Sequence, residues 1–335
     1  MQKTIILKKP IGFISGAAVG GMAEREGPFG EGFDFCDLTD TFGEKTWEMA
    51  ESKMVSVALN LALKKANLPH TALDLIAAGD LQNQCTATSF ALTPFATPLI
   101  GLYGACSTCT ESIAVISSIM NTYDDLEYCA AVTSSHNATA ERQFRTPLEY
   151  GGQRAKCAQW TATAAGAFIL GKGQERAAVL DVTFGIPRDS GTKDATNMGP
   201  AMAFAAADTI ISYFERSELL PSDFDCVVTG DLGFGGSRLL CEILSKKDTR
   251  LAEIHTDCGT LIYDKGRQDC HSGASGCGTS AAMLAAHFLP KLEKGELKRI
   301  LFLSTGALMN SSSTLQGKTI VGIAPAIRIE HTGDF

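Results

Sequence analysis

The stretch "LYGACSTCTES", residues 102–112, sets a cysteine among small residues at the junction of two patterns. The run "IAVISSIM" of residues 113–120 follows directly, with apolar residues at helical spacing. This order predicts a strand, a tight turn that carries Cys106, and then a helix. A thiol at the start of a helix meets the positive end of the helix dipole and free N–H groups, which favour an anion. Cys106 is therefore a candidate pocket residue; the alternative is a small cysteine that merely fits the turn.

This turn and its flanking segments occur twice in the chain. Three pairs of segments match in the same order: 66–81 with 218–232, 104–119 with 276–289, and 126–137 with 297–310. Each half alternates helical segments with short apolar strand segments, which is typical of an α/β fold with a largely parallel sheet. The matches predict a duplicated chain with halves at residues 1–171 and 172–335. Because no linker separates the halves, we expect one layered body.

The composition narrows the functional classes. Apolar residues make up 45% of the 335 residues and charged residues 20%, as in ordinary globular proteins. The net charge of −8 argues against a nucleic-acid partner. No apolar run is long enough for a transmembrane helix, and the start of the chain does not read as a signal peptide. Eleven cysteines without a pairing pattern indicate reduced thiols in a cytosol-like compartment. No motif predicts a cofactor or a metal site.

Two α/β halves with a cysteine at a strand-to-helix turn resemble the thiolase superfamily of acyl-condensing enzymes. More specifically, the chain resembles the stage V sporulation protein AD family. The resemblance rests on "TWEMAE" (46–51), "GACST" (104–108), "SSHNATAERQFRTPLEYGGQ" (134–153), "QWTATAAGA" (159–167), "NMGPAMAFAAADT" (197–209), "TGDLG" (229–233), "SGCGTSAA" (275–282) and "STGALMNSSSTLQGKTIVGIAP" (304–325).

The resemblance implies a thiolase-like fold, usually a homodimer. It also implies a protein on the cytoplasmic face, peripheral to the spore inner membrane, that acts with other stage V sporulation membrane proteins. That family is understood to take part in the uptake of dipicolinic acid into the developing spore, and to bind this acid rather than convert it.

The resemblance further implies where the partners of a catalytic thiol would lie. In the superfamily, a His or Asn follows a strand of the second half, and another lies at the turn that matches the nucleophile. Here the first loop carries Gly230 and Asp231, and the internal repeat sets Gly278 opposite Cys106. Glycine offers no base, and Asp231 beside a thiolate would oppose its ionisation. Unless His271 folds inward as a base, the catalytic set is incomplete.

Polar residues at two predicted strand ends are candidate ligands. His136 and Asn137 follow the strand in 126–137, and ligands often bind at the ends of parallel strands. His136 could bond a carboxylate, or it could bond loop backbone instead. Asn310 ends the matching segment of the second half and could either complete a polar wall or cap the next turn.

The segment after His136 is locally basic. It carries Arg142, Arg145, Arg154 and Lys156 together with two aromatic residues, Phe144 and Tyr150. The planar fork of arginine matches carboxylates, and an aromatic ring can stack on a pyridine. Arg145 is the preferred candidate, because it adjoins Phe144. The alternative is a solvated face with local ion pairs. The acidic run Asp34, Asp37, Asp40 and Glu44 lacks the loop of a calcium hand and is expected to be a solvated face.

The sequence therefore predicts a protein that binds dipicolinic acid, or its calcium salt, without chemical turnover. The predicted binding residues are Cys106, His136, Asn137, Arg142, Arg145, Asp231, Gly278 and Asn310. The rival hypothesis is an acyltransferase that forms an acyl-thioester on Cys106. A third is a scaffold with an empty pocket.

Overall fold

The computed structural model describes residues 2–145, 154–173 and 175–333. Over these residues, an eleven-stranded sheet runs through the molecule. Ten of its strands lie side by side in one row, and the eleventh, β2 (Phe35–Cys36), pairs with β1 outside this row. In order across the sheet, the strands of this row are β11 (His255–Asp257), β10 (Cys226–Thr229), β13 (Arg299–Leu303), β16 (Ala326–His331), β8 (Ala177–Thr183), β1 (Thr4–Gly20), β7 (Ala164–Lys172), β5 (Tyr128–Ser135), β3 (Leu75–Gly79) and β4 (Leu99–Gly101).

The two ends of this sheet have the same arrangement. In the first, β3 pairs in parallel with β4 and β5, and β7 is antiparallel to both β5 and β1. In the second, β10 pairs in parallel with β11 and β13, and β16 is antiparallel to both β13 and β8. The sheet is thus mixed, and the expectation of a largely parallel sheet was wrong, because the strands at the centre run against their neighbours.

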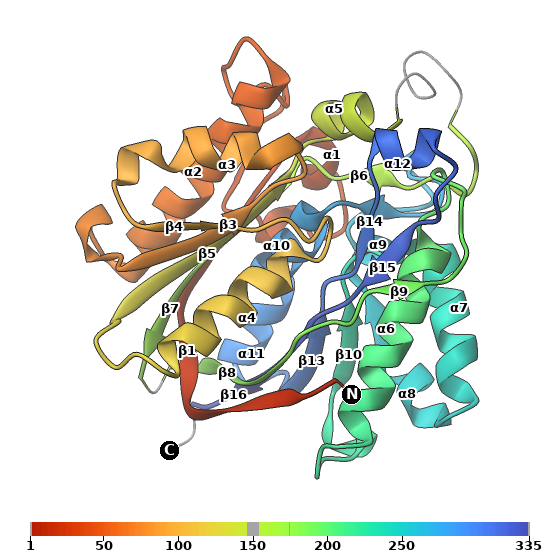
Figure 1. The fold of residues 1–335 in the computed structure, drawn as a ribbon. Coiled ribbons are helices and arrows are strands. Elements are labelled where there is room, and N and C mark those ends of the chain that lie inside the picture. Colours follow the sequence, from red (N-terminus) through yellow and green to blue (C-terminus); the bar gives the residue numbers. More distant parts are fainter. Residues whose placement is uncertain (1, 146–153, 174, 334–335) are drawn as a thin grey trace.

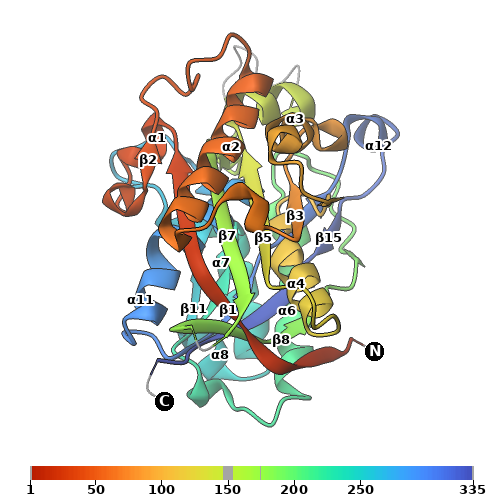
Figure 2. The ribbon, with the colours of Figure 1, turned by 90° about the vertical axis from the view of Figure 1, so that its left-hand side faces the viewer.

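Strand β1 joins the two ends. Its residues Ile11–Gly20 pair with β7, whereas Thr4–Ile6 and Ile11–Gly12 pair with β8. Figure 2 shows β1 running beside β7 before its first residues turn away toward the N-terminus. Because β1 pairs with a strand from each end, the sheet is continuous across the predicted boundary between residues 171 and 172. The predicted division into two halves stays a prediction.

Helices form layers on both sides of each sheet end (Figure 1). Helices α2 (Trp47–Ala66) and α3 (Thr86–Leu92) cover one outer face, and α6 (Gly199–Phe214) and α7 (Gly233–Ser245) cover the other. Helices α4 (Thr108–Met120) and α10 (Cys277–Met283) lie between the two ends, in the central apolar core. The segments that repeat in the sequence therefore occupy matching places.

The predicted helix that begins at "TWEMAE" shows why these segments fold as they do. The Thr46 hydroxyl accepts a hydrogen bond from the N–H of Met49 at 3.3 Å and so caps α2. Asn67 ends the helix in the left-handed conformation, with φ of +55°. Between them, Met54, Leu59 and their neighbours at helical spacing are buried against the sheet.

Shorter elements surround the end of the molecule that holds the Cys106 turn. Two small sheets pair β12 (Ala274–Ser275) with β6 (Trp160–Thr161), and β15 (Val321–Ile323) with both β14 (Gly306–Leu308) and β9 (Arg188–Asp189). The other α-helices of the described residues are α1 (Met22–Arg25), α5 (Asn137–Ala140), α8 (Thr249–Glu253), α9 (Cys258–Leu261), α11 (Leu289–Glu293) and α12 (Ser311–Leu315). Two π-helical turns are η5 (Glu141–Arg145) and η7 (Leu284–Phe288), and short 3-10 helices are η1 (Gly30–Gly32), η2 (His70–Ala72), η3 (Asn83–Cys85), η4 (Thr93–Phe95) and η6 (Pro221–Asp223). Within the described ranges, none of the helices is both long and apolar enough to cross a membrane.

Candidate functional site

Cys106 lies in the turn between β4 and α4, as predicted, and only 5% of it is exposed. The turn is tight: Ala105 has a φ of +51°, which residues with a side chain rarely adopt. Gly104 leaves room for the Glu111 side chain, since a Cβ at this position would lie 2.2 Å from an oxygen of Glu111. The backbone therefore holds the thiol in one place at the start of the helix.

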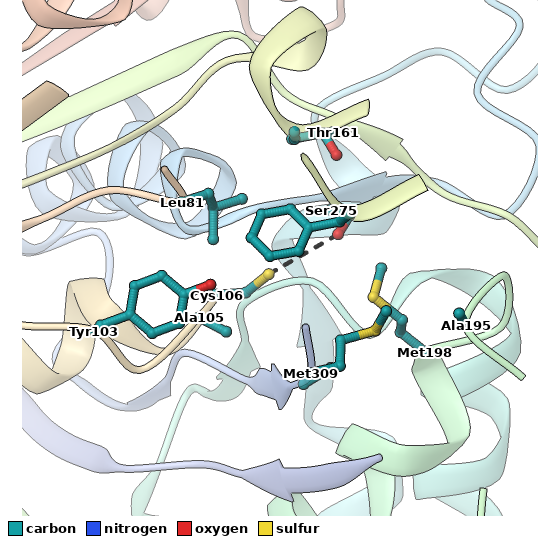
Figure 3. Close-up of a pocket in the computed structure, with 12 residues that line it drawn as sticks. Leu81, Tyr103, Ala105, Cys106, Thr161, Ala195, Met198, Ser275 and Met309 are labelled. Carbon is teal, nitrogen blue, oxygen red and sulfur yellow. Dashed lines mark hydrogen bonds between the residues drawn. The ribbon is translucent and has the colours of Figure 1, made fainter. Parts of the chain in front are cut away.

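The neighbours of the thiol come from the second half of the chain. The Asp231 carboxylate is near enough to the Cys106 thiol for its negative charge to raise the pKa of the thiol. The Ser275 hydroxyl lies 3.9 Å from Cys106 Sγ, and Figure 3 shows the sulfur directed toward it. A second thiol, Cys277, belongs to the same buried cluster as Cys106 and donates to the carbonyl oxygen of Ser134 at 2.9 Å.

Asp231 is held firmly by its surroundings. Its carboxylate accepts hydrogen bonds from the Gly276 N–H and the Thr305 hydroxyl, both at 2.8 Å. The Gln159 amide donates to its carbonyl oxygen at 2.7 Å. Asp257 fixes the loop that follows, because its carboxylate accepts from the N–H of Leu232 at 2.9 Å. Hydrogen bonds therefore fix the position of the Asp231 carboxylate in the site.

The charges at the site keep the thiol neutral. Burial raises the pKa of Asp231 to about 6, so this carboxyl is mostly ionised at neutral pH. Burial, and then the negative charge of Asp231, raise the pKa of the Cys106 thiol well above its usual 9. These effects outweigh the hydrogen bonds at Gly276 and Ser275 that favour the thiolate. Cys106 is therefore a protonated thiol rather than an activated nucleophile.

The thiol opens onto a small, mostly apolar pocket. Figure 3 shows Tyr103 on one side of Cys106, and Met198 and Met309 on the other. The pocket is lined by Leu81, Tyr103, Ala105, Cys106, Ala140, Phe144, Thr161, Ala195, Met198, Ser275, Ala307 and Met309. None of these described lining residues carries a basic or imidazole side chain. The free cavity volume is about 30 Å³, room for about two water molecules.

The sequence pointed to this pocket but missed several of its residues. Ser275 and Cys277 lie inside "SGCGTSAA", the turn that the repeat alignment had identified, although the alignment singled out Gly278. Tyr103 lies inside the quoted nucleophile turn. Met198 and Met309 carry no sequence signal that distinguishes them from core methionines.

His136 and Asn137 do not line the pocket. His136 caps α5, since its Nδ1 accepts from the Ala138 N–H at 3.2 Å and its Nε2 donates to the Asp40 carbonyl at 2.8 Å. It is 1% exposed, and burial lowers its pKa. The Asn137 amide donates to the Thr161 carbonyl at 3.1 Å. The structure thus places both residues in backbone contacts, the alternative left open for His136.

Asn310 and Gly278 are also structural in this arrangement. The Asn310 side chain accepts from the Ser313 N–H at 2.8 Å and caps α12, which was the alternative to a polar wall. Gly278 lies in α10, where a Cβ would come within 2.1 Å of the Ala164 carbonyl oxygen. Its lack of a side chain serves the close packing of α10 against β7.

Of the basic residues of this segment, the three whose side chains the structure describes do not line the pocket. The Arg142 guanidinium pairs with Glu48. The Arg154 guanidinium pairs with Asp269 at 3.2 Å and lies 4.6 Å from the centre of the Trp160 ring, while Lys156 is exposed. Arg145 follows Phe144 in the turn η5, and its side chain is outside the described part of the structure, as is Tyr150.

His271 does not supply the missing base, because both of its ring nitrogens contact other groups. Its Nδ1 donates to the Ala155 carbonyl at 2.9 Å, and its Nε2 lies 2.9 Å from a carboxylate oxygen of Asp269. Across residues 2–145, 154–173 and 175–333, no group of three or more His, Cys, Asp or Glu side chains is arranged to hold a metal ion, and this includes the acidic run from Asp34 to Glu44.

Buried carboxyls make the stability of the fold depend on pH. Burial raises the pKa of Glu24, Asp80 and Asp257 to about 7. Near pH 6 these groups are protonated in the folded chain and ionised in the unfolded chain, so unfolding releases protons. His255 and His287, with pKa values lowered to about 4, act in the opposite direction, but only below the ordinary histidine value of 6.5.

We therefore expect the free energy of unfolding to fall as the pH rises from about 6.5 to about 8, by about 1 kcal/mol for each of the three carboxyls. Urea unfolding at several pH values measures this change. A free energy that is constant or rising over this range would contradict the raised pKa values of these carboxyls.

Comparison with solved structures shows the class of fold. The chain is similar to OleA of Xanthomonas campestris with cerulenin bound, at 12% identity and a TM-score of 0.62, covering 96% of this chain and 100% of that one. It is also similar to the tetronic acid condensing enzyme AbyA1, at 16% identity and a TM-score of 0.60, covering 96% and 99%. A third is 3-oxoacyl-(acyl-carrier-protein) synthase III of Aquifex aeolicus, at 12% identity and a TM-score of 0.58, covering 96% and 100%. The fold is thiolase-like, as predicted.

Comparison of sequences shows the family. Stage V sporulation protein AD of Bacillus subtilis (strain 168) is 37% identical over 332 residues, which cover 99% of this chain and 98% of that protein. The family model of stage V sporulation protein AD matches residues 1–330. The chain belongs to the stage V sporulation protein AD family, and the resemblance inferred from the sequence is confirmed.

Proposed function

We propose that this protein binds dipicolinic acid, or its calcium salt, in the Cys106 pocket during spore formation, and that it does so without chemical turnover. The observation that carries the proposal is the burial of the pocket thiol near Asp231, whose negative charge adds to the raised pKa of the thiol. A condensing enzyme needs a thiolate and a base, and this site favours the protonated thiol. Because catalysis is disfavoured, binding of a ligand is the better explanation for the Cys106 pocket.

Acyl transfer on Cys106 is the second candidate function, and the charges of the site disfavour it. Asp231 is the titratable group beside the thiol, and its pKa of about 6 lies far below that of the thiol. Transfer of the thiol proton to this carboxylate is therefore uphill, and it would leave a thiolate in a buried site. A stable acyl adduct on Cys106 after incubation with acyl-coenzyme A, seen by mass spectrometry, would support the enzyme instead.

The pocket offers groups that suit an aromatic diacid. Tyr103 and Phe144 provide rings that can pack against a pyridine, and the Ser275 and Thr161 hydroxyls can bond a carboxylate. The predicted cationic partner is Arg145, which follows Phe144 in η5. A pyridine ring with two carboxylates is much larger than the present free volume, so binding requires side chains at the mouth to move.

Two arginines of the same turn give a matched test. We expect Arg145→Ala to weaken dipicolinate binding by about tenfold or more, because a charge-assisted hydrogen bond is lost. Arg142→Ala should leave the affinity nearly unchanged, since Arg142 pairs with Glu48. Isothermal titration of each purified variant with dipicolinate, with and without calcium, measures both effects.

The outcomes identify the arginine that contacts the ligand and separate a binding pocket from an empty scaffold. Equal affinities for Arg145→Ala and the unmodified protein would remove Arg145 from the site. A stronger loss with Arg142→Ala would show that the ion pair with Glu48 opens on binding. No heat signal with dipicolinate in any variant would leave the empty scaffold as the better explanation.

The proposal includes a location and partners. We place the protein on the cytoplasmic face of the spore inner membrane, where it would pass its ligand to other stage V sporulation membrane proteins. We also propose a homodimer. Strand β4 is at one end of the sheet, with 41% of Leu99 exposed, and Phe90 and Tyr103 are 62% and 42% exposed. An edge strand with exposed apolar side chains is suited to pairing with a second copy, which sedimentation equilibrium would detect.

A further inference from the structure

Phe144 is a partly buried residue that lines the pocket beside the buried thiol. It packs against the cluster of Leu81, Cys106, Ala140 and Cys277. Each of these four residues is at most 6% exposed, whereas Phe144 is only partly buried. Because the free cavity beside the thiol has a volume of about 30 Å³, a molecule larger than water reaches Cys106 only if a lining side chain moves. Tyr103 also lines the pocket and is 42% exposed. Phe144 is the partly exposed residue of the apolar cluster that contains Cys106, and it is a candidate for this movement.

The residue before it, Gln143, holds this part of the chain to two other segments. The Gln143 side-chain oxygen accepts a hydrogen bond from the Asn83 N–H at 2.9 Å, in the loop after β3. The Gln143 carbonyl oxygen accepts from the Ser311 hydroxyl at 2.9 Å, at the start of α12. Both hydrogen bonds are exposed to solvent, so each can exchange for water at little cost.

The base of the same segment is fixed in a different way. The Thr139 hydroxyl donates to the buried Glu51 carboxylate at 2.8 Å, and the Asn137 amide donates to the Thr161 carbonyl at 3.1 Å. The helix changes from α to π between Ala140 and Glu141. Single π-helical turns are often found at functional sites. The segment thus has a buried, fixed base and a tip held by two exposed hydrogen bonds.

We propose that Gln143 is a positioning residue, a latch that keeps Phe144 over Cys106 and so controls which molecules enter the pocket. In the latched state, the pocket admits water. Release of the Gln143 contacts lets the π-helical turn shift and moves the Phe144 ring away from the thiol. The inference deepens the proposed binding function and rests on it for the nature of the ligand, but the latch itself can be tested without that ligand.

The first experiment measures access to the thiol. N-ethylmaleimide labelling of Cys106 is followed by mass spectrometry of peptides in the unmodified protein and in Gln143→Ala. Loss of one exposed hydrogen bond should raise the labelling rate about three- to tenfold. Gln143→Glu keeps an acceptor for the Asn83 N–H and should restore the slow rate. Ser311→Ala removes the second bond and should raise the rate independently.

Two controls distinguish a released latch from a loosened fold. Cys129 is fully buried in β5, so its labelling should stay slow in every variant unless the whole protein unfolds more often. Gln316→Ala changes an exposed glutamine at the end of α12, and it should leave the rate at Cys106 unchanged. Equal labelling of Cys106 in Gln143→Ala, Ser311→Ala and the unmodified protein would overturn the latch, and so would a parallel rise at Cys129.

The second experiment measures dipicolinate association by stopped flow in the same variants. A faster association in Gln143→Ala that matches the faster labelling supports both the latch and the proposed ligand. Faster labelling without any dipicolinate binding would keep the latch and reject the proposed function. Normal dipicolinate binding with unchanged labelling would keep the function and reject the latch.

Discussion

Asp231→Asn is expected to raise the alkylation rate of the Cys106 thiol on the order of 100-fold at about pH 8. The negative charge of Asp231 contributes to the raised pKa of this thiol, and its removal lowers that pKa. A like charge in contact with a buried group shifts a pKa by about 2 units, and each unit changes the thiolate fraction tenfold. Burial remains, so the pKa should stay above its ordinary value.

The substitution suits this test because the asparagine can keep the local hydrogen bonds. Its amide oxygen can accept from the Gly276 N–H, and its amide nitrogen can donate to the Thr305 hydroxyl, which are the two partners of the carboxylate. The labelling rate with iodoacetamide, measured on peptides by mass spectrometry, reports the change. Cys106→Ser provides the blank, and Cys129 reports any loosening of the core.

The result bears directly on the proposed function. A rate at Cys106 that does not change in Asp231→Asn would show that the carboxylate does not hold the thiol in its protonated form. The argument for a binding pocket without catalysis would then lose its basis, and the acyltransferase hypothesis would gain. A large rise would show that one charge accounts for much of the low reactivity of the site.

Gly278→Ala should strongly destabilise the fold, with about 3 kcal/mol or more of lost unfolding free energy. The new Cβ would lie 2.1 Å from the Ala164 carbonyl oxygen and 2.7 Å from the Ser135 hydroxyl oxygen. The first of these atoms belongs to the backbone of β7 and cannot move without disturbing the centre of the sheet. Urea unfolding, or the recovered yield of folded protein, measures the loss.

Gly235→Ala is the matched control, because it also places a methyl group in a helix. The nearest atom to a Cβ at this exposed position of α7 is the Ser272 hydroxyl oxygen at 3.7 Å, an ordinary contact. Alanine favours a helix over glycine, so this variant should be as stable as the unmodified protein or slightly more stable. If Gly278→Ala were equally well tolerated, the close approach of α10 to β7 would be refuted.

Local patterns made much of the fold predictable. The segments that repeat in the sequence became matching strands and helices, since apolar periodicity reports which face of one short segment is buried. The turn at Cys106 was also predictable, because the small residues around it leave room for a tight connection between β4 and α4. The antiparallel direction of the central strands was not predictable. The pairing of these strands depends on contacts between segments that are far apart in the sequence.

The candidate site was predictable only in part. The alignment of the repeat led to the turn of α10, but it singled out Gly278, whereas Ser275 and Cys277 are the residues of that turn near the thiol. An error of one or two residues in the alignment of a turn changes which side chain is expected to face the pocket. Sequence similarity alone does not fix the alignment to that precision. His136 at a strand end was undecided for a similar reason, and its contacts with Asp40 and Ala138 settle its place.

By itself, the sequence determined that this protein has an α/β pattern with a thiol at a helix start, and that histidine is absent from the two positions where a base was sought. Only the tertiary structure decided that Asp231 faces this thiol, that His136 and Asn310 serve as helix caps, and that Phe144 packs over the pocket. The physical reason is that periodicity and turn chemistry act within one segment, while the charge state of a buried group depends on the side chains that packing brings to it from elsewhere in the chain.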